Sequence, residues 1–302
     1  TGKNRRGTRM ACLAAALALA ACILACAGCK RAAQPRDTGH DAVPQRIVSM
    51  SPGVTESIFF LSEQDRLVGR TDHCNYPPGA ADIASIGGYG QPSIERIVAL
   101  DPDLVITTNS SAHPSFTKLQ SLGMNVQNIE TQTLEDVFAM IVRIGRMLDV
   151  EDKARKRVGA LRARVDAVRR RHASESHALR VYVEIDYAPI FTVGNQGFLN
   201  DMLTILGAEN IFGDIDQGYP QVGTEAVILR DPEIIFLGHG TYGDSALERV
   251  RSRAGWETIS AVRTGRVFGD LDPDLYHRPS PRLVQGLLEM ESRIYGQQDN
   301  AK

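Results

Sequence analysis

Residues 89–107 read YGQPSIERIVALDPDLVIT, and residues 219–237 read YPQVGTEAVILRDPEIIFL. The two segments align without a gap and share a Tyr, a Gln, a Glu and an Asp-Pro pair at the same offsets. In each, a short helix-like run ends at Asp-Pro, because proline disfavours helical backbone in the residue before it. A short apolar run follows, as expected of a buried parallel strand. The repeat predicts one helix–strand unit in each of two related α/β lobes.

The sequence on either side of the two segments continues the alternation of strands and helices. In the first half we expect strands at residues 46–50, 67–69, 104–107 and 124–129, and helices at 52–61, 94–100, 115–122 and 134–148. Pro52 suits the first position of a helix that Ser51 begins. In the second half we expect strands at residues 179–185, 233–237 and 266–268, helices at 198–206, 225–229 and 280–295, and a loop at 187–194.

Between the two halves, residues 151–173 predict one long, strongly basic helix. Its apolar residues recur every three or four positions and form a single narrow stripe: Ala154, Val158, Leu161, Val165 and Val168. Such a stripe fits a helix that packs against its own chain on one side, or the seam of a coiled-coil dimer. We favour packing within the chain, because the stripe covers barely two heptads and its residues are small.

These patterns predict an α/β fold with two Rossmann-like lobes, one long helix between them and a ligand cleft between the lobes. The expected N-terminal lobe spans residues 45–149, the interlobe helix 150–175 and the C-terminal lobe 176–297. A chain of 302 residues suits two domains of about 100–150 residues each.

Composition excludes several classes of function. The chain is 43% hydrophobic and 23% charged with a net charge of −2, and no basic patch carries interleaved aromatics, so we expect no nucleic-acid partner. The body contains no G-x-S-x-G, H-E-x-x-H or C-x-x-C motif, so we expect neither an enzyme nor a metal site. A Ser-His-Asp triad assembled in space leaves no such motif, and an exported hydrolase therefore remains an alternative.

The N-terminal residues 1–29 resemble a bacterial export leader, with basic residues followed by an apolar run. Leu19-Ala20-Ala21-Cys22 has the form of a lipobox, whose Cys becomes lipid-modified; Cys29 is the alternative and Cys26 a weaker one. A single membrane anchor and an ordinary signal peptide are the competing interpretations. We expect a lipid-anchored protein on the periplasmic or cell-surface side, with residues 30–44 as a flexible tether.

Four of the five cysteines lie in this leader, and Cys74 is the only one in the body. No disulfide within the body is therefore expected, and the role of Cys74 stays open.

Glu95 and Glu225 lie in the first turn of the repeated helix in each segment. A carboxylate there interacts favourably with the helix dipole, and common ancestry of the lobes would explain the match. Two matched acidic residues also suit docking onto a two-fold symmetric partner. Tyr89 and Tyr219, six residues earlier, lie on loops that face the crevice of an α/β lobe, where opposed rings can clamp a flat ligand. Alternatively, each ring packs over its own lobe.

The segments SPGVTE, DHCNYPPGA, ERIVALDPDLVI, PIFTVG, YPQVGTE and YHRPSPRLVQG resemble the iron-siderophore/vitamin B12 family of substrate-binding proteins of bacterial ABC importers, most of all its vitamin B12-binding branch. The resemblance covers residues 46–296. It implies a protein that captures a small molecule and delivers it to a membrane permease dimer driven by ATPase subunits, with Glu95 and Glu225 docking onto the permease. The ligand it implies is cobalamin or a related corrinoid, and no bound cofactor is expected.

Carried over position by position, the resemblance also implies these ligand-binding residues: Gly53, His73, Tyr89, Phe191, Tyr219, Asp274 and Arg278. The family pattern has Trp where this chain has Tyr89, Thr108 and Tyr219, and Tyr at the position of His73. The loss of three indoles leaves ferric siderophore and haem as alternative ligands. His73 and His277 are either solvent-facing or able to approach a metal centre of the ligand.

Overall fold

The computed structural model describes residues 42–108, 114–173, 177–238 and 246–296. Val43–Lys302 forms one compact unit that contains every described helix and strand and three apolar clusters, so it holds what it needs to fold without the leader. The predicted leader, most of the tether and the lipidation candidates Cys22, Cys26 and Cys29 lie outside the described residues.

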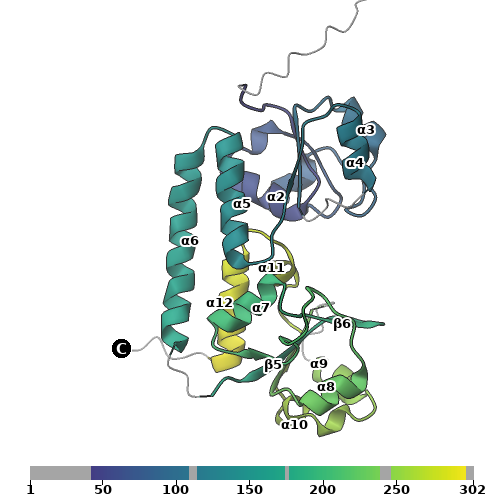
Figure 1. The fold of residues 1–302 in the computed structure, drawn as a ribbon, viewed down its shortest axis with the longest axis vertical. Coiled ribbons are helices and arrows are strands. Elements are labelled where there is room, and N and C mark those ends of the chain that lie inside the picture. Colours follow the sequence, from purple (N-terminus) through teal and green to yellow (C-terminus); the bar gives the residue numbers. More distant parts are fainter. Residues whose placement is uncertain (1–41, 109–113, 174–176, 239–245, 297–302) are drawn as a thin grey trace, which may run out of the picture. The chain divides into compact units, whose positions relative to one another are not determined.

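The N-terminal lobe, coloured purple to teal in Figure 1, is built on a sheet of four parallel strands in the order β2-β1-β3-β4. The strands are β1 (Ile47–Ser49), β2 (Leu67–Arg70), β3 (Leu104–Thr108) and β4 (Val126–Ile129). The helices are α2 (Pro52–Phe60), α3 (Ile94–Ala99), α4 (Pro114–Ser121) and α5 (Leu134–Met147), with short 3-10 turns at Gln64–Arg66 and Pro78–Asp82. Pro52 occupies the first turn of α2 after Ser51, as predicted.

The C-terminal lobe is built on a second sheet, in the order β6-β5-β8-β9 with β7 also paired to β5. Its strands are β5 (Arg180–Tyr187), β6 (Ile190–Thr192), β7 (Glu209–Asn210), β8 (Ile234–Leu237) and β9 (Val267–Phe268). Its helices are α7 (Phe198–Ile205), α8 (Thr224–Arg230), α9 (Ala246–Arg251), α10 (Ser260–Thr264), α11 (Asp274–His277) and α12 (Leu283–Tyr295), with a 3-10 turn at Trp256–Thr258.

The predicted loop at residues 187–194 is wrong. β5 continues to Tyr187, and β6 folds back to pair with it in antiparallel orientation, with Phe191 opposite Asp186. Pro189 suggested a loop, but it lies in the turn between the strands, and the β-branched residues Ile190 and Thr192 on either side of Phe191 pair with β5. The lobe therefore carries one antiparallel edge strand on an otherwise parallel sheet.

Alternate residues of the central strands enter different apolar clusters. Ile47 and Ile106 pack in the large cluster that also holds α2, α5 and α6, whereas Val48 packs on the other face with α3. The second sheet repeats this arrangement: Val181 lies in the large cluster with α7 and α12, and Tyr182 packs on the opposite face with α8. Because side chains alternate along a strand, α6 lies on one face of both sheets, and α3 and α8 on the other.

The long helix α6 (Glu151–His172) packs within the chain, as predicted. Its apolar stripe is buried in the large cluster, which also contains residues of α5, α7 and α12. A coiled-coil dimer would need the same stripe, so the structure does not support that alternative. The predicted fold of two α/β lobes and a long helix is confirmed.

The acidic residue that directly follows the Asp-Pro pair in each repeated segment has a structural role that the sequence did not reveal. Asp103 accepts hydrogen bonds from the backbone N–H groups of Gln45 (2.8 Å) and Arg46 (3.0 Å). Glu233 accepts one from the N–H of Arg180, also at 3.0 Å. Each carboxylate thus fixes the start of the first strand of its lobe. In both Asp-Pro pairs the aspartate has a left-handed backbone conformation, with φ of 46° at Asp101 and 39° at Asp231.

We expect the beginning of α6 to make stability pH-dependent. Hydrogen bonds from Arg146 and Arg155 lower the pKa of Glu151 from 4.5 to about 2. A lowered folded-state pKa stabilises the protein above the unfolded pKa, and this contribution is lost as the pH falls from 4.5 towards 2. Glu151→Gln should therefore show a smaller loss of stability across this range in urea unfolding, most clearly at low salt because the group is exposed. Identical pH profiles for both proteins would refute this role.

Candidate functional site

In the N-terminal lobe, two loops beyond the strands bring His73 and Tyr89 together. The backbone N–H of Tyr89 donates to Nδ1 of His73 over 3.4 Å, and the N–H of Asp72 donates to the carbonyl of Gly87 over 2.9 Å. The side chain of Tyr89 is 43% exposed. The structure therefore places an imidazole and an exposed phenol, both predicted as ligand contacts, in one loop cluster.

In the C-terminal lobe, strand β6 brings Phe191 beside the loop of Tyr219. Phe191 forms a bridge with Gln221, and the N–H of Thr192 donates to the carbonyl of Pro220 over 3.0 Å. Tyr219 is 46% exposed, whereas Phe191 is partly buried. Strand β6, which the sequence did not predict, thus positions Phe191 and Tyr219, two of the predicted site residues.

Tyr89 and Tyr219 lie close enough for the ionised form of Tyr89 to affect the pKa of Tyr219. Burial raises the pKa of Tyr219, and the charge of Tyr89 raises it further. Tyr219 is nevertheless almost half exposed, at 46%. The corresponding tyrosines of the two repeated segments therefore lie close enough for one to affect the pKa of the other, and each keeps exposed surface available for a ligand.

Arg278 links the predicted site residues of both lobes. Its guanidinium pairs with Asp274 at 2.8 Å and donates to Oδ1 of Asn75, in the loop that carries His73, at 2.7 Å. Burial raises the pKa of Asp274, and Arg278 partly offsets this. An arginine held from two sides is oriented without a ligand, and it remains able to donate further hydrogen bonds.

A buried carboxylate next to Arg278 is the principal feature that sequence reasoning missed. Glu56 of α2 is 2% exposed and accepts two hydrogen bonds of 2.8 Å from Arg282; Arg278 lies 3.4 Å from the same carboxylate. Arg282 also stacks on the ring of Tyr76. We call Glu56, Arg278 and Arg282 the interlobe clamp, because it joins the N-terminal lobe to the segment between α11 and α12. The residues lie in segments noted for the resemblance, but more than 200 positions separate Glu56 from its partners.

Gly53 lies against this clamp. A Cβ at Gly53 would come within 2.1 Å of the carbonyl oxygen of Pro279, so only glycine permits this approach of the two lobes. The predicted contact of Gly53 with a ligand stays a prediction, because the structure gives this residue a packing role that requires no ligand.

Glu95 and Glu225 occupy the exposed first turns of α3 and α8. The pKa of Glu95 is lowered by its backbone N–H and by the hydroxyl of Ser93, which donates to Oε2 over 3.0 Å. On the same helices, Val98 is 47% and Leu229 is 86% exposed. Each lobe therefore presents a carboxylate beside exposed apolar surface.

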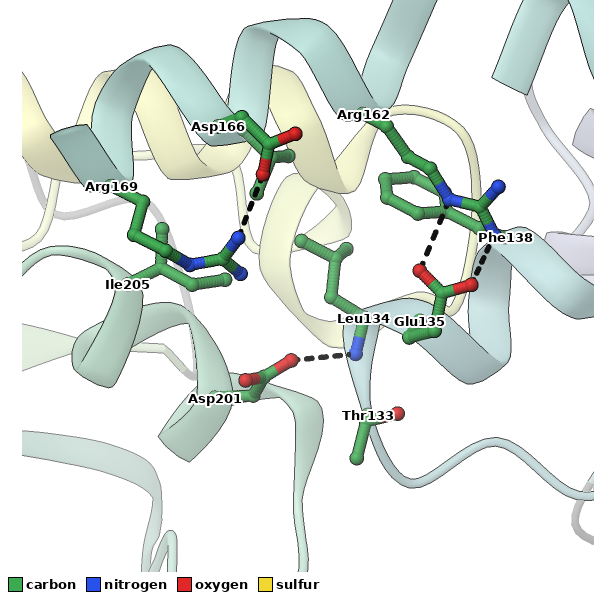
Figure 2. Close-up of a pocket in the computed structure, with 10 residues that line it drawn as sticks. Thr133, Leu134, Glu135, Phe138, Arg162, Asp166, Arg169, Asp201 and Ile205 are labelled. Atoms are coloured by element: carbon green, nitrogen blue, oxygen red, sulfur yellow. Dashed lines mark hydrogen bonds and ion pairs between the residues drawn. The ribbon is translucent and has the colours of Figure 1, made fainter. Parts of the chain in front are cut away.

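Two grooves flank α6, and neither is lined by Tyr89 or Tyr219. One, of about 480 Å³, lies between α5, α6 and α7 (Figure 2); there Asp201 accepts a 2.9 Å hydrogen bond from the N–H of Leu134, and Arg162 pairs with Glu135. The other, of about 360 Å³, lies beside the clamp and includes Tyr76 and Arg164. We assign the candidate site to the region around Tyr89 and Tyr219. The matched residues of the two lobes identify this site, whereas neither groove does.

We expect the clamp to dominate the stability of the interlobe contact. Glu56→Ala leaves Arg282 and Arg278 without their buried partner and should lower the free energy of unfolding by roughly 3–5 kcal/mol in urea titrations. The matched control Glu56→Met/Arg282→Met removes the charges of Glu56 and Arg282 together. It should lose less free energy of unfolding than Glu56→Ala does. Unchanged stability of Glu56→Ala would show that the clamp contributes little.

Comparison with known proteins gives a consistent result. A family model described as periplasmic binding protein matches residues 47–274. The uncharacterized ABC transporter substrate-binding lipoprotein YvrC of Bacillus subtilis is 30% identical over 83% of this chain and 80% of its own length.

Two solved structures share the fold and part of the sequence. The periplasmic vitamin B12-binding protein of Vibrio cholerae has a TM-score of 0.73 and 26% identity, covering 83% of this chain and 97% of the other. A periplasmic heme-binding protein of Pseudomonas aeruginosa has a TM-score of 0.74 and 25% identity, covering 84% and 94%. With two α/β lobes, a long helix and these matches, the chain belongs to the periplasmic binding protein family.

Proposed function

We propose that the protein captures a corrinoid outside the cytoplasm and delivers it to an ABC importer. The observation that carries this proposal is the pair formed by Tyr89 and Tyr219, which occupy matching positions in the repeated segments of the two lobes and are both almost half exposed. A flat macrocycle between two aromatic rings buries a large apolar area, and the phenol hydroxyls can hydrogen-bond to its rim. The similar vitamin B12-binding protein supports this choice of ligand.

We assign the polar groups around the tyrosines to the edges of the macrocycle. Arg278 and Asp274 carry fixed donors and acceptors that suit amide side chains, and Phe191 extends the aromatic surface beside Tyr219. His73, beside Tyr89, is placed to approach the face or rim of the ligand. Gly53 contributes by allowing the lobes to approach.

A ferric siderophore or haem is the alternative ligand. Arg278 suits the carboxylates of such ligands, and an exposed imidazole at His73 suits iron. The similar heme-binding protein supports this alternative. Family members are substrate-binding proteins rather than enzymes, and we propose no catalytic role.

We further propose that a lipid on Cys22, with Cys29 as the alternative, anchors the protein to the membrane after removal of the leader. The lipobox-like sequence before Cys22 and the name of the Bacillus relative support this. Within the described residues, no helix is long and apolar enough to cross a membrane.

Glu95 and Glu225 are our proposed contacts to the permease. They project from α3 and α8 in corresponding positions, on the same face of the two sheets. A permease dimer presents the same surface twice, so one carboxylate from each lobe suits it. Val98 and Leu229 supply apolar area next to these charges.

Titration calorimetry of residues 43–302 with corrinoids, haem and ferric siderophores tests the choice of ligand. We expect heat with a corrinoid, and a decrease in affinity of about 10- to 100-fold in Tyr89→Ala and in Tyr219→Ala, because each loses a buried aromatic contact. Leu122→Ala, at an equally exposed position after α4, should bind as the wild type does. Binding of haem or a siderophore but of no corrinoid would select the alternative ligand.

A transport assay tests the docking residues separately. We expect Glu95→Ala/Glu225→Ala to bind ligand as tightly as the wild type and to lose ligand uptake in cells, because charge pairs with the permease are removed. The control Glu130→Ala/Glu257→Ala also removes one exposed glutamate from each lobe and should transport normally. Normal uptake by the first variant would exclude these two residues as the docking contacts.

A further inference from the structure

The groove beside the interlobe clamp has features that neither the fold nor the proposed function uses. Its volume of about 360 Å³ lies within the range of about 300–1,000 Å³ that is typical of sites for small molecules. None of the predicted ligand-binding residues lines it. The groove is therefore separate from the region around Tyr89 and Tyr219.

Aromatic side chains from separate parts of the chain line this groove. Phe59 and Phe60 come from α2, Leu161 from α6, and Pro281 from the residues just before α12. The loop residue Tyr76 also lines it and is 43% exposed. Both phenylalanines are only partly buried, so three aromatic side chains keep surface that the core does not cover. An open, concave apolar surface of this kind is typical of a ligand site.

The groove also carries a positive charge that no described residue neutralises. Glu56 and Arg282 line the groove, but two hydrogen bonds of 2.8 Å pair them with each other. Arg164 is exposed and makes no hydrogen bond or ion pair with the residues that the structure describes. No acidic residue lies three or four positions from it, the spacing at which Glu151 pairs with Arg155. The guanidinium of Arg164 is thus available to a ligand.

We propose that this groove binds a small aromatic anion, that is, a carboxylate or sulfonate carried on one or a few rings. The rings of such a ligand pack against Phe59, Phe60 and Tyr76, and its anionic group accepts charge-assisted hydrogen bonds from Arg164. Arg164 repels a cationic ligand, and a neutral ligand leaves this guanidinium partly desolvated without a partner. The aromatic lining and the single unpaired charge therefore select the class of ligand.

The size of the groove favours a small molecule over a protein partner. Ten residues line it, whereas a stable protein interface takes about 20–30 residues from each side. Its walls come from α2 in the N-terminal lobe, from α6 and from the start of α12 in the C-terminal lobe. A bound ligand therefore contacts both lobes, and it should stabilise the folded protein against thermal unfolding.

Fluorescence titration of residues 43–302 with anilinonaphthalene sulfonate, an aromatic anion, tests the proposal. We expect saturable binding to the folded protein and a rise in its melting temperature. Arg164→Gln should weaken binding about 10-fold, since a hydrogen bond to a charged group contributes on this order. The matched control Arg170→Gln removes the same charge from an exposed position of α6 outside the groove, and it should bind as the wild type does.

A neutral probe and a measurement of position complete the test. Phenylnaphthylamine has the same rings without the sulfonate, so Arg164→Gln should leave its affinity unchanged. On addition of the sulfonate, amide chemical shifts should change at Phe60 and Leu161 and stay constant at Tyr89 and Tyr219. Without a ligand, thermal unfolding of both single variants should match the wild type, because both side chains are exposed.

Four results would overturn the proposal. The first is the absence of saturable binding of the sulfonate by the wild type. The second is equal weakening in Arg164→Gln and Arg170→Gln, which would mean that net charge alone decides. The third is chemical-shift change at Tyr89 and Tyr219 instead of at the groove. The fourth is a dimer in sedimentation experiments that Arg164→Gln dissociates, which would make a second copy of the chain the occupant.

Discussion

The carboxylate of Glu56 is the constraint on which the arrangement of the site depends. It is buried between the lobes, and both of its guanidinium partners come from the other lobe. A buried charge without its partner is strongly unfavourable, so the two lobes can separate only at a large cost in free energy. The same contact fixes Arg278, which holds Asn75 in the loop of His73 and Asp274 on α11. Gly53 permits the approach that makes the contact possible.

Most of the fold could be predicted because its determinants are local. Pro52 begins α2, the stripe from Ala154 to Val168 defines α6, and the repeated Asp-Pro pairs end α3 and α8. β6 was missed because its pairing with β5 overrides the loop signal of Pro189. The short helices α9 to α11 were missed because segments of this length show little periodicity.

The candidate site could be predicted only in part. Sequence and family resemblance singled out His73, Tyr89, Phe191 and Tyr219, and the structure brings them together as two pairs, one in each lobe. The clamp could not be predicted, since no spacing rule relates Glu56 to Arg282 across 226 positions. The repeat likewise gave no reason for its final acidic residue, which fixes the first strand of each lobe through Asp103 and Glu233.

The central claim is that the interlobe clamp holds the lobes at one separation, and a distance between them tests it most directly. Spin labels at Lys118→Cys and Arg263→Cys, in the Cys74→Ser background of residues 43–302, report from one exposed site on each lobe. Pulsed electron paramagnetic resonance should give one narrow distance distribution, which becomes broad when Glu56→Ala is added. A broad distribution in the parent protein, or an equally narrow one in Glu56→Ala, would contradict the account.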